Sequence, residues 1–158
     1  MKITLLTVGK TDVPWIREGL QLYCGRLVHY VSFELKELPH LKGTSSLGTA
    51  QIKEKEGAMI IGCLTPSDFL VLLDEKGKQF SSKEFSLYLS SKMNMPQGRS
   101  IVFCIGGAYG FSPGVYSRSN DIMSLGKMTF SHQMVRTIFA EQLYRAFTIL
   151  RGEPYHHE

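Results

Sequence analysis

The segment most suited to chemistry is a glycine-rich loop in the second half of the chain. The apolar run 101–105 ends at Gly106 and Gly107, and Gly110 follows three residues later. Because glycine has no Cβ, the backbone amides of this loop can approach a ligand closely, although a plain turn between strand and helix remains the alternative. The spacing does not match a dinucleotide fingerprint, and the chain contains no GxxxxGK[ST] phosphate loop.

Two side chains near the start of the last expected helix are further candidates. Ser131 is a plausible N-cap, and His132 follows it. An imidazole can accept a proton near neutral pH, although a lone histidine is more often structural or solvated. Arg136 falls within the apolar arc of the same helix, where a guanidinium needs a carboxylate or another anion. The alternative is that Arg136 reaches solvent from the first turn of the helix.

The C-terminal tail, residues 152–158, reads GEPYHHE. Tyr155 offers a stacking surface and His156 a titratable group that could accept a proton. Arg145 and Arg151 precede the tail and add positive charge beside it. A frayed terminus, or a remnant of a tag, is the alternative interpretation of this segment.

Alternating strands and helices must position these residues. The hydrophobic pattern predicts strands at 3–8, 31–38, 69–73, 100–105 and 121–125, and helices at 15–30, 49–64, 83–93, 113–119 and 132–150. Continuously apolar strands that alternate with helices are typical of an α/β fold, with a mostly parallel sheet covered by helices on both faces. Ligands bind beyond the carboxyl ends of such strands. We therefore expect the strands that end near Leu73, Ile105 and Leu125 to deliver their ends to one site.

Composition limits the class of protein. A chain of 158 residues with 43% hydrophobic residues suits one domain spanning 1–158. The net charge of +4 permits a nucleic-acid partner without requiring one. The three cysteines form no CxxC pair, so no metal site is expected. No secretory signal or membrane-length apolar run is visible, which favours a cytoplasmic protein without a membrane partner.

The last helix has an unusually wide apolar surface. Its apolar residues occupy an arc of about 180°, more than a helix needs to cover its own sheet. The excess suggests a second copy of the chain as partner. We expect the outer part of the arc, including Phe139, Leu143 and Phe147, to contact that copy.

Several motifs are specific in combination, although each is weak alone. They are LLDEKG, IGGAYGFS, SLGKMTFSHQMVR, and EQLYRAF followed by RGEPYHH. Over its whole length the chain resembles the ribosomal RNA large subunit methyltransferase H (RlmH) family, a branch of the SPOUT methyltransferases. The resemblance implies a C-terminal trefoil knot, a homodimer and S-adenosyl-L-methionine as methyl donor. It also implies methylation of N3 of a pseudouridine in 23S rRNA, on assembled ribosomes.

The resemblance also assigns site residues by position. The implied cofactor contacts are Leu73, Gly106, Gly107, Leu125, Gly126, Lys127, Met128, Thr129 and Phe130. The catalytic candidates are His156, Tyr155, His132 and Arg136, with Tyr155 and His156 expected to place and deprotonate the pseudouridine. With an RNA substrate implied, Arg145 and Arg151 are candidates for contacts with RNA phosphates, and Tyr155 for stacking on a base. A non-catalytic RNA-binding assembly factor with the same fold is the main alternative. A different α/β enzyme that uses the glycine loop for a nucleotide is the second.

Overall fold

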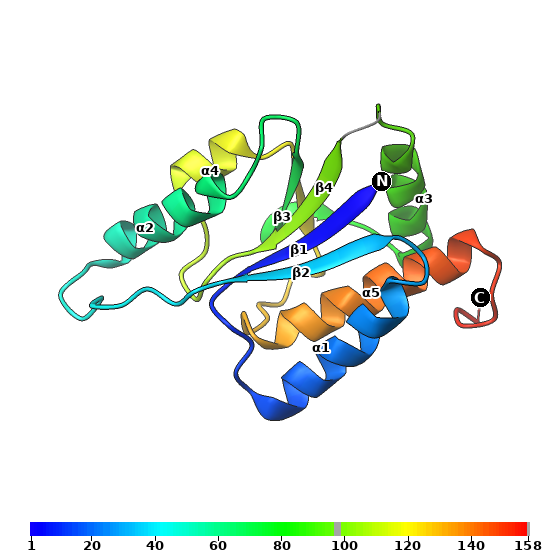
Figure 1. Cartoon of the computed structure of the whole chain (residues 1–158), viewed down its shortest axis with the longest axis horizontal. Helices are drawn as coiled ribbons and strands as arrows, with labels where there is room; N and C mark the ends of the chain where they lie inside the picture. The colour runs from blue at the N-terminus through cyan, green and yellow to red at the C-terminus, as the bar shows by residue number, and fades with distance from the viewer. Residues whose placement is uncertain (97–98, 158) are drawn as a thin grey trace.

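A five-stranded parallel sheet forms the centre of the computed structural model, which describes residues 1–96 and 99–157 (Figure 1). The strand order is β2-β1-β4-β3-β5, and every neighbouring pair runs parallel. This confirms the predicted α/β class with a parallel sheet. The strands are β1 (Lys2–Val8), β2 (Ser32–Leu38), β3 (Phe69–Gln79), β4 (Ser100–Ile105) and β5 (Asp121–Ser124).

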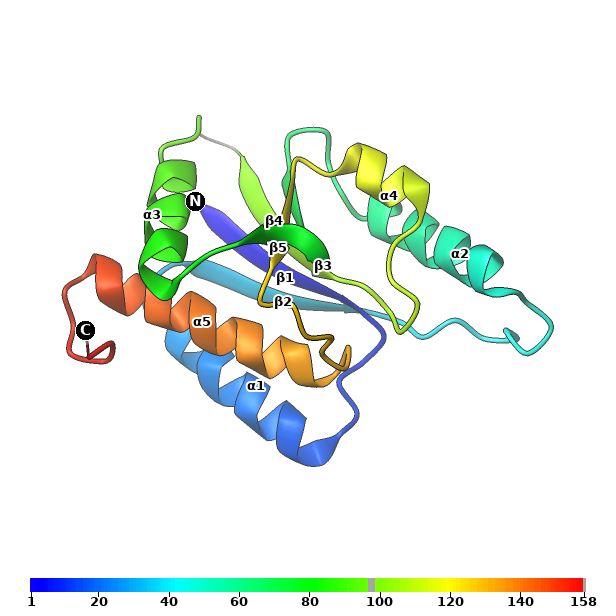
Figure 2. The same ribbon diagram turned by 180° about the vertical axis from the view of Figure 1, so that it is seen from behind.

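Helices cover both faces of the sheet, as predicted (Figures 1 and 2). One face carries α1 (Pro14–Leu27), α3 (Ser82–Met93) and α5 (Met134–Leu150), and the other carries α2 (Thr49–Gly62) and α4 (Pro113–Arg118). Successive strand residues point to opposite faces, so Leu5 and Phe103 pack in the core beneath α5 while Leu6 and Cys104 pack in the core beneath α2. Burial on both faces explains why β1 and β4 are apolar at most positions and do not alternate with charged residues.

The capping chemistry of α3 follows the sequence. The Ser81 hydroxyl accepts the Glu84 backbone N–H at 3.2 Å, and the Glu84 carboxylate accepts the Ser81 N–H at 2.6 Å. This reciprocal capping box satisfies two backbone donors that the first turn of a helix leaves free.

Some element boundaries differ from the prediction. β3 was expected to end at Leu73, but it continues to Gln79, and its register against β5 shifts between Leu73 and Lys78. The second half of β3 is polar because it lies at the margin of the sheet, so its sequence does not show the apolar pattern of a buried strand. α5 begins at Met134 rather than at residue 132, while the Ser131 hydroxyl still accepts the Met134 N–H at 3.0 Å.

None of the helices within 1–96 and 99–157 is long and apolar enough to cross a lipid bilayer. The trefoil knot and the single-domain organisation stay predictions.

Candidate functional site

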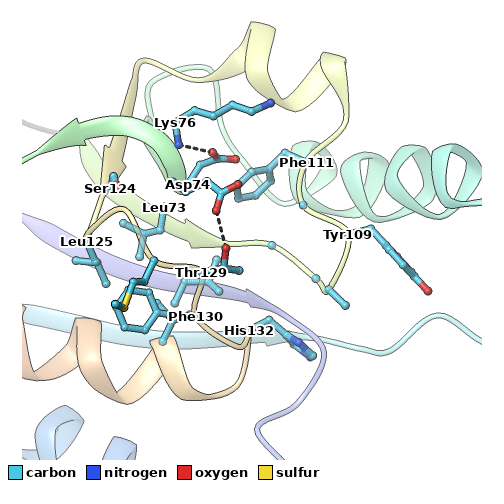
Figure 3. A pocket seen from close by; sticks show the side chains of 18 of the residues that line it. Leu73, Asp74, Lys76, Tyr109, Phe111, Ser124, Leu125, Thr129, Phe130 and His132 are labelled. Atoms are coloured by element: carbon cyan, nitrogen blue, oxygen red, sulfur yellow. Dashed lines mark hydrogen bonds between the residues drawn. The ribbon is translucent and has the colours of Figure 1, made fainter.

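The carboxyl ends of β3, β4 and β5 enclose a cavity of about 350 Å³ (Figure 3), here called the strand-end cavity. Leu73 lies within β3, where its pairing with β4 ends, while the glycine loop follows β4 and the segment 125–130 follows β5. The expectation that these three strand ends meet is confirmed. All of the implied cofactor contacts except Lys127 line this cavity. Their role as ligand contacts stays a prediction.

One wall of the strand-end cavity is apolar and is braced by backbone turns. Leu73, Leu125 and Met128 line it, and the Met128 side chain is 81% exposed. Within the same segment, the Ser124 hydroxyl donates to the Gly126 carbonyl at 2.7 Å, which tightens the turn after β5. Such a wall can enclose a flat apolar group while its turns offer backbone donors and acceptors.

The opposite wall is charged. The Thr129 hydroxyl donates to the Glu75 carboxylate at 2.8 Å, linking the segment after β5 to β3 (Figure 3). The Asp74 carboxylate accepts the Lys76 N–H at 2.8 Å and the Tyr116 hydroxyl, and burial with this hydrogen bond raises the pKa of Tyr116. Lys53 and Lys76 also line the cavity, so its lining offers groups of both signs of charge beside these two carboxylates. The sequence analysis did not identify Asp74 and Glu75 as site residues, although the polar run DEK directly after the apolar part of β3 could have indicated them.

The glycine loop has little room for side chains. Gly107 and Gly110 form an isolated antiparallel bridge, and Gly110 has a φ of +84° that other residues rarely adopt. A Cβ on Gly106 would lie 3.1 Å from the Phe111 ring, and a Cβ on Gly107 would lie 2.4 Å from the Glu56 carboxylate. The loop turns the chain and also lines the strand-end cavity, and the contact of its amides with a ligand stays a prediction.

His132 lies where the sequence placed it, on the wall of the strand-end cavity just before α5 (Figure 3). Burial lowers its pKa, and the neighbouring charge of Arg136 lowers it further. The imidazole is therefore mostly neutral at pH 7 and able to accept a proton. Its catalytic role stays a prediction.

Arg136 is fully buried, so the alternative in which it reaches solvent is wrong. The expected carboxylate partner is Glu37, with 3.4 Å between the guanidinium and the carboxylate. The guanidinium also donates to the Thr11 hydroxyl and to the carbonyls of Val8, Gly9 and His132, all at 2.8–2.9 Å. Arg136 does not line the strand-end cavity. This corrects its place among the catalytic candidates, because its donors are used to join β1 to the start of α5.

The tail lies at the far end of α5 from the strand-end cavity (Figure 1). α5 has 17 residues, which at 1.5 Å per residue separate its ends by about 25 Å. The Tyr155 hydroxyl donates to Glu141 at 3.0 Å, and Arg145 lies over the Tyr155 ring and 3.2 Å from a His156 nitrogen. These contacts argue against a frayed terminus over 152–157, while residue 158 lies outside the described residues. One chain alone does not bring Tyr155 and His156 to its own His132.

The remaining RNA candidates also lie beside the tail. Arg145 is bound to Glu141 at 2.6 Å, so part of its charge is neutralised locally. Arg151 stacks on the Tyr30 ring at 4.2 Å and remains half exposed. Their contact with RNA stays a prediction.

Comparison with known proteins connects the geometry to a family. The sequence profile of a family described as "Predicted SPOUT methyltransferase" matches residues 1–156. A protein of Parabacteroides distasonis named "Ribosomal RNA large subunit methyltransferase H" is 54% identical over 158 residues, the full length of both chains. Proteins with the same name from Christiangramia forsetii and Porphyromonas gingivalis are 54% and 52% identical over 99% and 100% of each chain.

Proposed function

Because this chain belongs to the SPOUT methyltransferase family, we propose that it methylates N3 of a pseudouridine in 23S rRNA, with S-adenosyl-L-methionine as donor. The proposed substrate is the rRNA of the assembled ribosome, and the proposed place is the cytoplasm. Full-length relatives at 52–54% identity, each named for methylation of large-subunit rRNA, support the reaction class. The observation that carries the proposal is that the implied cofactor positions, Lys127 excepted, line one cavity.

The residues of the strand-end cavity suit this donor. Leu73, Leu125 and Met128 provide an apolar wall for an adenine ring, and the backbone of the glycine loop can meet its polar edge. Asp74 and Glu75 with Lys53 and Lys76 line the cavity, so groups of opposite charge are available to the cationic and anionic groups of the donor. When bound, S-adenosyl-L-methionine supplies a methyl group on a positively charged sulfur.

The protein's own tasks are alignment and proton removal. N3 of pseudouridine carries a proton that must leave as the methyl group arrives, so a neutral base near the strand-end cavity is needed. His132 is neutral at pH 7 because of its lowered pKa and lines that cavity. Tyr155 and His156 are the other candidates, and in a dimer they would act on the cavity of the partner subunit. N3 lies on the Watson–Crick edge, so the base must be unpaired or flipped.

We infer a homodimer from the exposed apolar residues of α1 and α5. Trp15 and Leu22 on α1 and Val28 directly after it are 51–61% exposed, and Met134 and Leu150 at the two ends of α5 are 38–41% exposed. The prediction that Phe139, Leu143 and Phe147 contact the partner is wrong, since each is at most 3% exposed within its own core. These three residues were predicted to lie at the dimer interface because the apolar arc of α5 is wider than contact with a sheet requires. In the structure the protein's own core buries this wider arc.

Calorimetry tests the cofactor. We expect the wild-type protein to bind S-adenosyl-L-methionine and not ATP or NAD, and Gly106→Val to lose that binding because the loop has no room for a side chain. Gly62→Val is the matched control, since a Cβ there meets nothing within 4 Å. Wild-type affinity in folded Gly106→Val would refute the assignment, and preferential ATP or NAD binding would favour the nucleotide enzyme.

Transfer of a labelled methyl group to ribosomal particles tests the reaction, and a primer-extension stop at the modified base locates it. Ribosome binding without cofactor binding would support the non-catalytic assembly factor. Light scattering tests the dimer: we expect about twice the chain mass of 17.8 kDa at micromolar concentration, and a fully active monomer would refute it.

A further inference from the structure

A second cavity of about 230 Å³ adjoins the strand-end cavity and is here called the His40 cavity. The two share four lining residues, so only the glycine loop and the start of α5 separate them; the shared residues are Gly107, Ala108, Tyr109 and His132. The other residues of the His40 cavity come from the end of β1, the segment after β2 and helix α2. None of the implied cofactor contacts except Gly107 lines it.

The His40 cavity lies at a reversal in the sheet topology. β1 and β4 are neighbours, yet β1 leads through α1 to β2 on one side, and β4 leads through α4 to β5 on the other. α1 and α4 cover opposite faces of the sheet (Figures 1 and 2). Val8 at the end of β1 and Gly107 after β4 both line the cavity. Ligands of open α/β sheets bind at such a switch point.

The size and openness of the cavity fit a single base that enters from outside. Its volume corresponds to roughly eight water molecules at liquid density, enough for one pyrimidine ring and not for a base pair. His40 and Tyr109, both on its wall, have 56% and 55% of their surface exposed. Tyr109 extends away from the apolar wall at Leu73 and Leu125 (Figure 3), where its ring is free to stack on an incoming base.

The polar groups on the wall match the N1 edge of a pseudouridine. That edge presents a ring N–H beside one carbonyl oxygen, so it needs one acceptor next to one donor. The Glu56 carboxylate is an acceptor, and one of its contacts is the Gly107 backbone N–H. His40 lies close enough to Glu56 to influence its charge, and the Thr44 hydroxyl on the same wall is a donor for the neighbouring carbonyl oxygen.

We propose that the His40 cavity receives the target pseudouridine of the RNA, and that the Glu56 carboxylate accepts the N1–H of that base, which leaves N3 free to face the cofactor and His132. This rests on the methyl transfer proposed above, and it names the subsite that holds the acceptor. The shared wall then places the base beside the cofactor and next to His132. Lys53, one turn before Glu56 on α2, lines the strand-end cavity and can meet a phosphate of the flanking RNA.

The test compares Glu56→Gln with Glu54→Gln, a control on the same helix with an exposed side chain. The glutamine at 56 keeps an oxygen for the Gly107 N–H but loses the negative charge. Calorimetry measures S-adenosyl-L-methionine affinity, and methyl transfer to ribosomal particles at saturating cofactor gives kcat and KM for the RNA. Thermal unfolding by circular dichroism verifies that each variant is folded.

We expect Glu56→Gln to lower kcat/KM for the RNA about tenfold or more, since a charged hydrogen bond is lost. Its cofactor affinity should stay within about twofold of wild type, the range of the control. Wild-type transfer kinetics in Glu56→Gln would overturn the inference. A parallel loss of cofactor affinity would also overturn it, because Glu56 would then only support the loop. If the wild-type protein neither binds the cofactor nor methylates ribosomes, the proposed function fails first, and this inference falls with it.

Discussion

Replacing Arg136 by methionine should destabilise the fold severely. The side chain is 0% exposed, and its guanidinium donates to three carbonyls, one hydroxyl and one carboxylate. Methionine has a similar length but no donor, so the buried carbonyls of Val8 and Gly9 lose a partner. Removing one partner of a buried ionic network costs about 3–5 kcal/mol. Glu37 is 29% exposed and can regain water, which places the expected loss toward the lower end of that range.

Equilibrium unfolding in urea, followed by circular dichroism, measures this loss. Arg136→Lys keeps the charge, but a single ammonium cannot reach all of the acceptors, so we expect a smaller loss of about 1–3 kcal/mol. Arg99→Met, at an exposed position, should change the free energy of unfolding by less than about 0.5 kcal/mol. If Arg136→Met is as stable as Arg99→Met, the guanidinium is not the link between β1 and α5 that its contacts indicate.

Three further outcomes follow from the contacts described above. In an NMR titration, the His132 imidazole should titrate below pH 6.5, and a titration midpoint above 6.5 would contradict this. The unfolded chain takes up this proton at a higher pH than the folded chain, so the free energy of unfolding should fall as pH drops below 6.5. Ending the chain after Gly152 should leave cofactor affinity unchanged while removing most methyl transfer to ribosomal particles. Full transfer by the shortened protein would show that the tail has no part in the reaction. Ser81→Ala should cost about 1 kcal/mol of unfolding free energy, measured in urea, because the Glu84 N–H loses its acceptor; an unchanged midpoint would show that water replaces the cap.

The sheet could be predicted because its signal is local. The apolar runs of β1 and β4 are buried on both faces, so each reads as a strand without knowledge of its neighbours. The same holds for the capping box at Ser81. β3 was cut short because its second half pairs with β5 through polar residues whose pattern carries no sign of a partner.

The site was predicted only in part, because the rest depends on contacts between distant segments. The resemblance to a known family identified the segment 125–130 as part of the site, and the ends of the predicted strands pointed to Leu73 and Gly106. Glu56 looked like one of several solvated charges in an expected helix. Nothing local shows that its carboxylate meets the Gly107 amide, 51 positions later in the chain. Likewise, the sequence showed that Arg136 needed an anion, but the choice of Glu37 follows from the pairing of β1 with β2.

The length of α5 has a genetic consequence if the tail acts on a partner subunit. The helix holds the tail about 25 Å from the strand-end cavity of its own chain. Each chain would therefore contribute its cavity to one active site of the dimer and its tail to the other. An allele with Gly106→Val and an allele that ends after Gly152 would each produce an inactive homodimer. In a cell that expresses both, mixed dimers would combine one intact cavity with one intact tail. The two defective alleles would therefore complement each other, restoring at most one working site per mixed dimer.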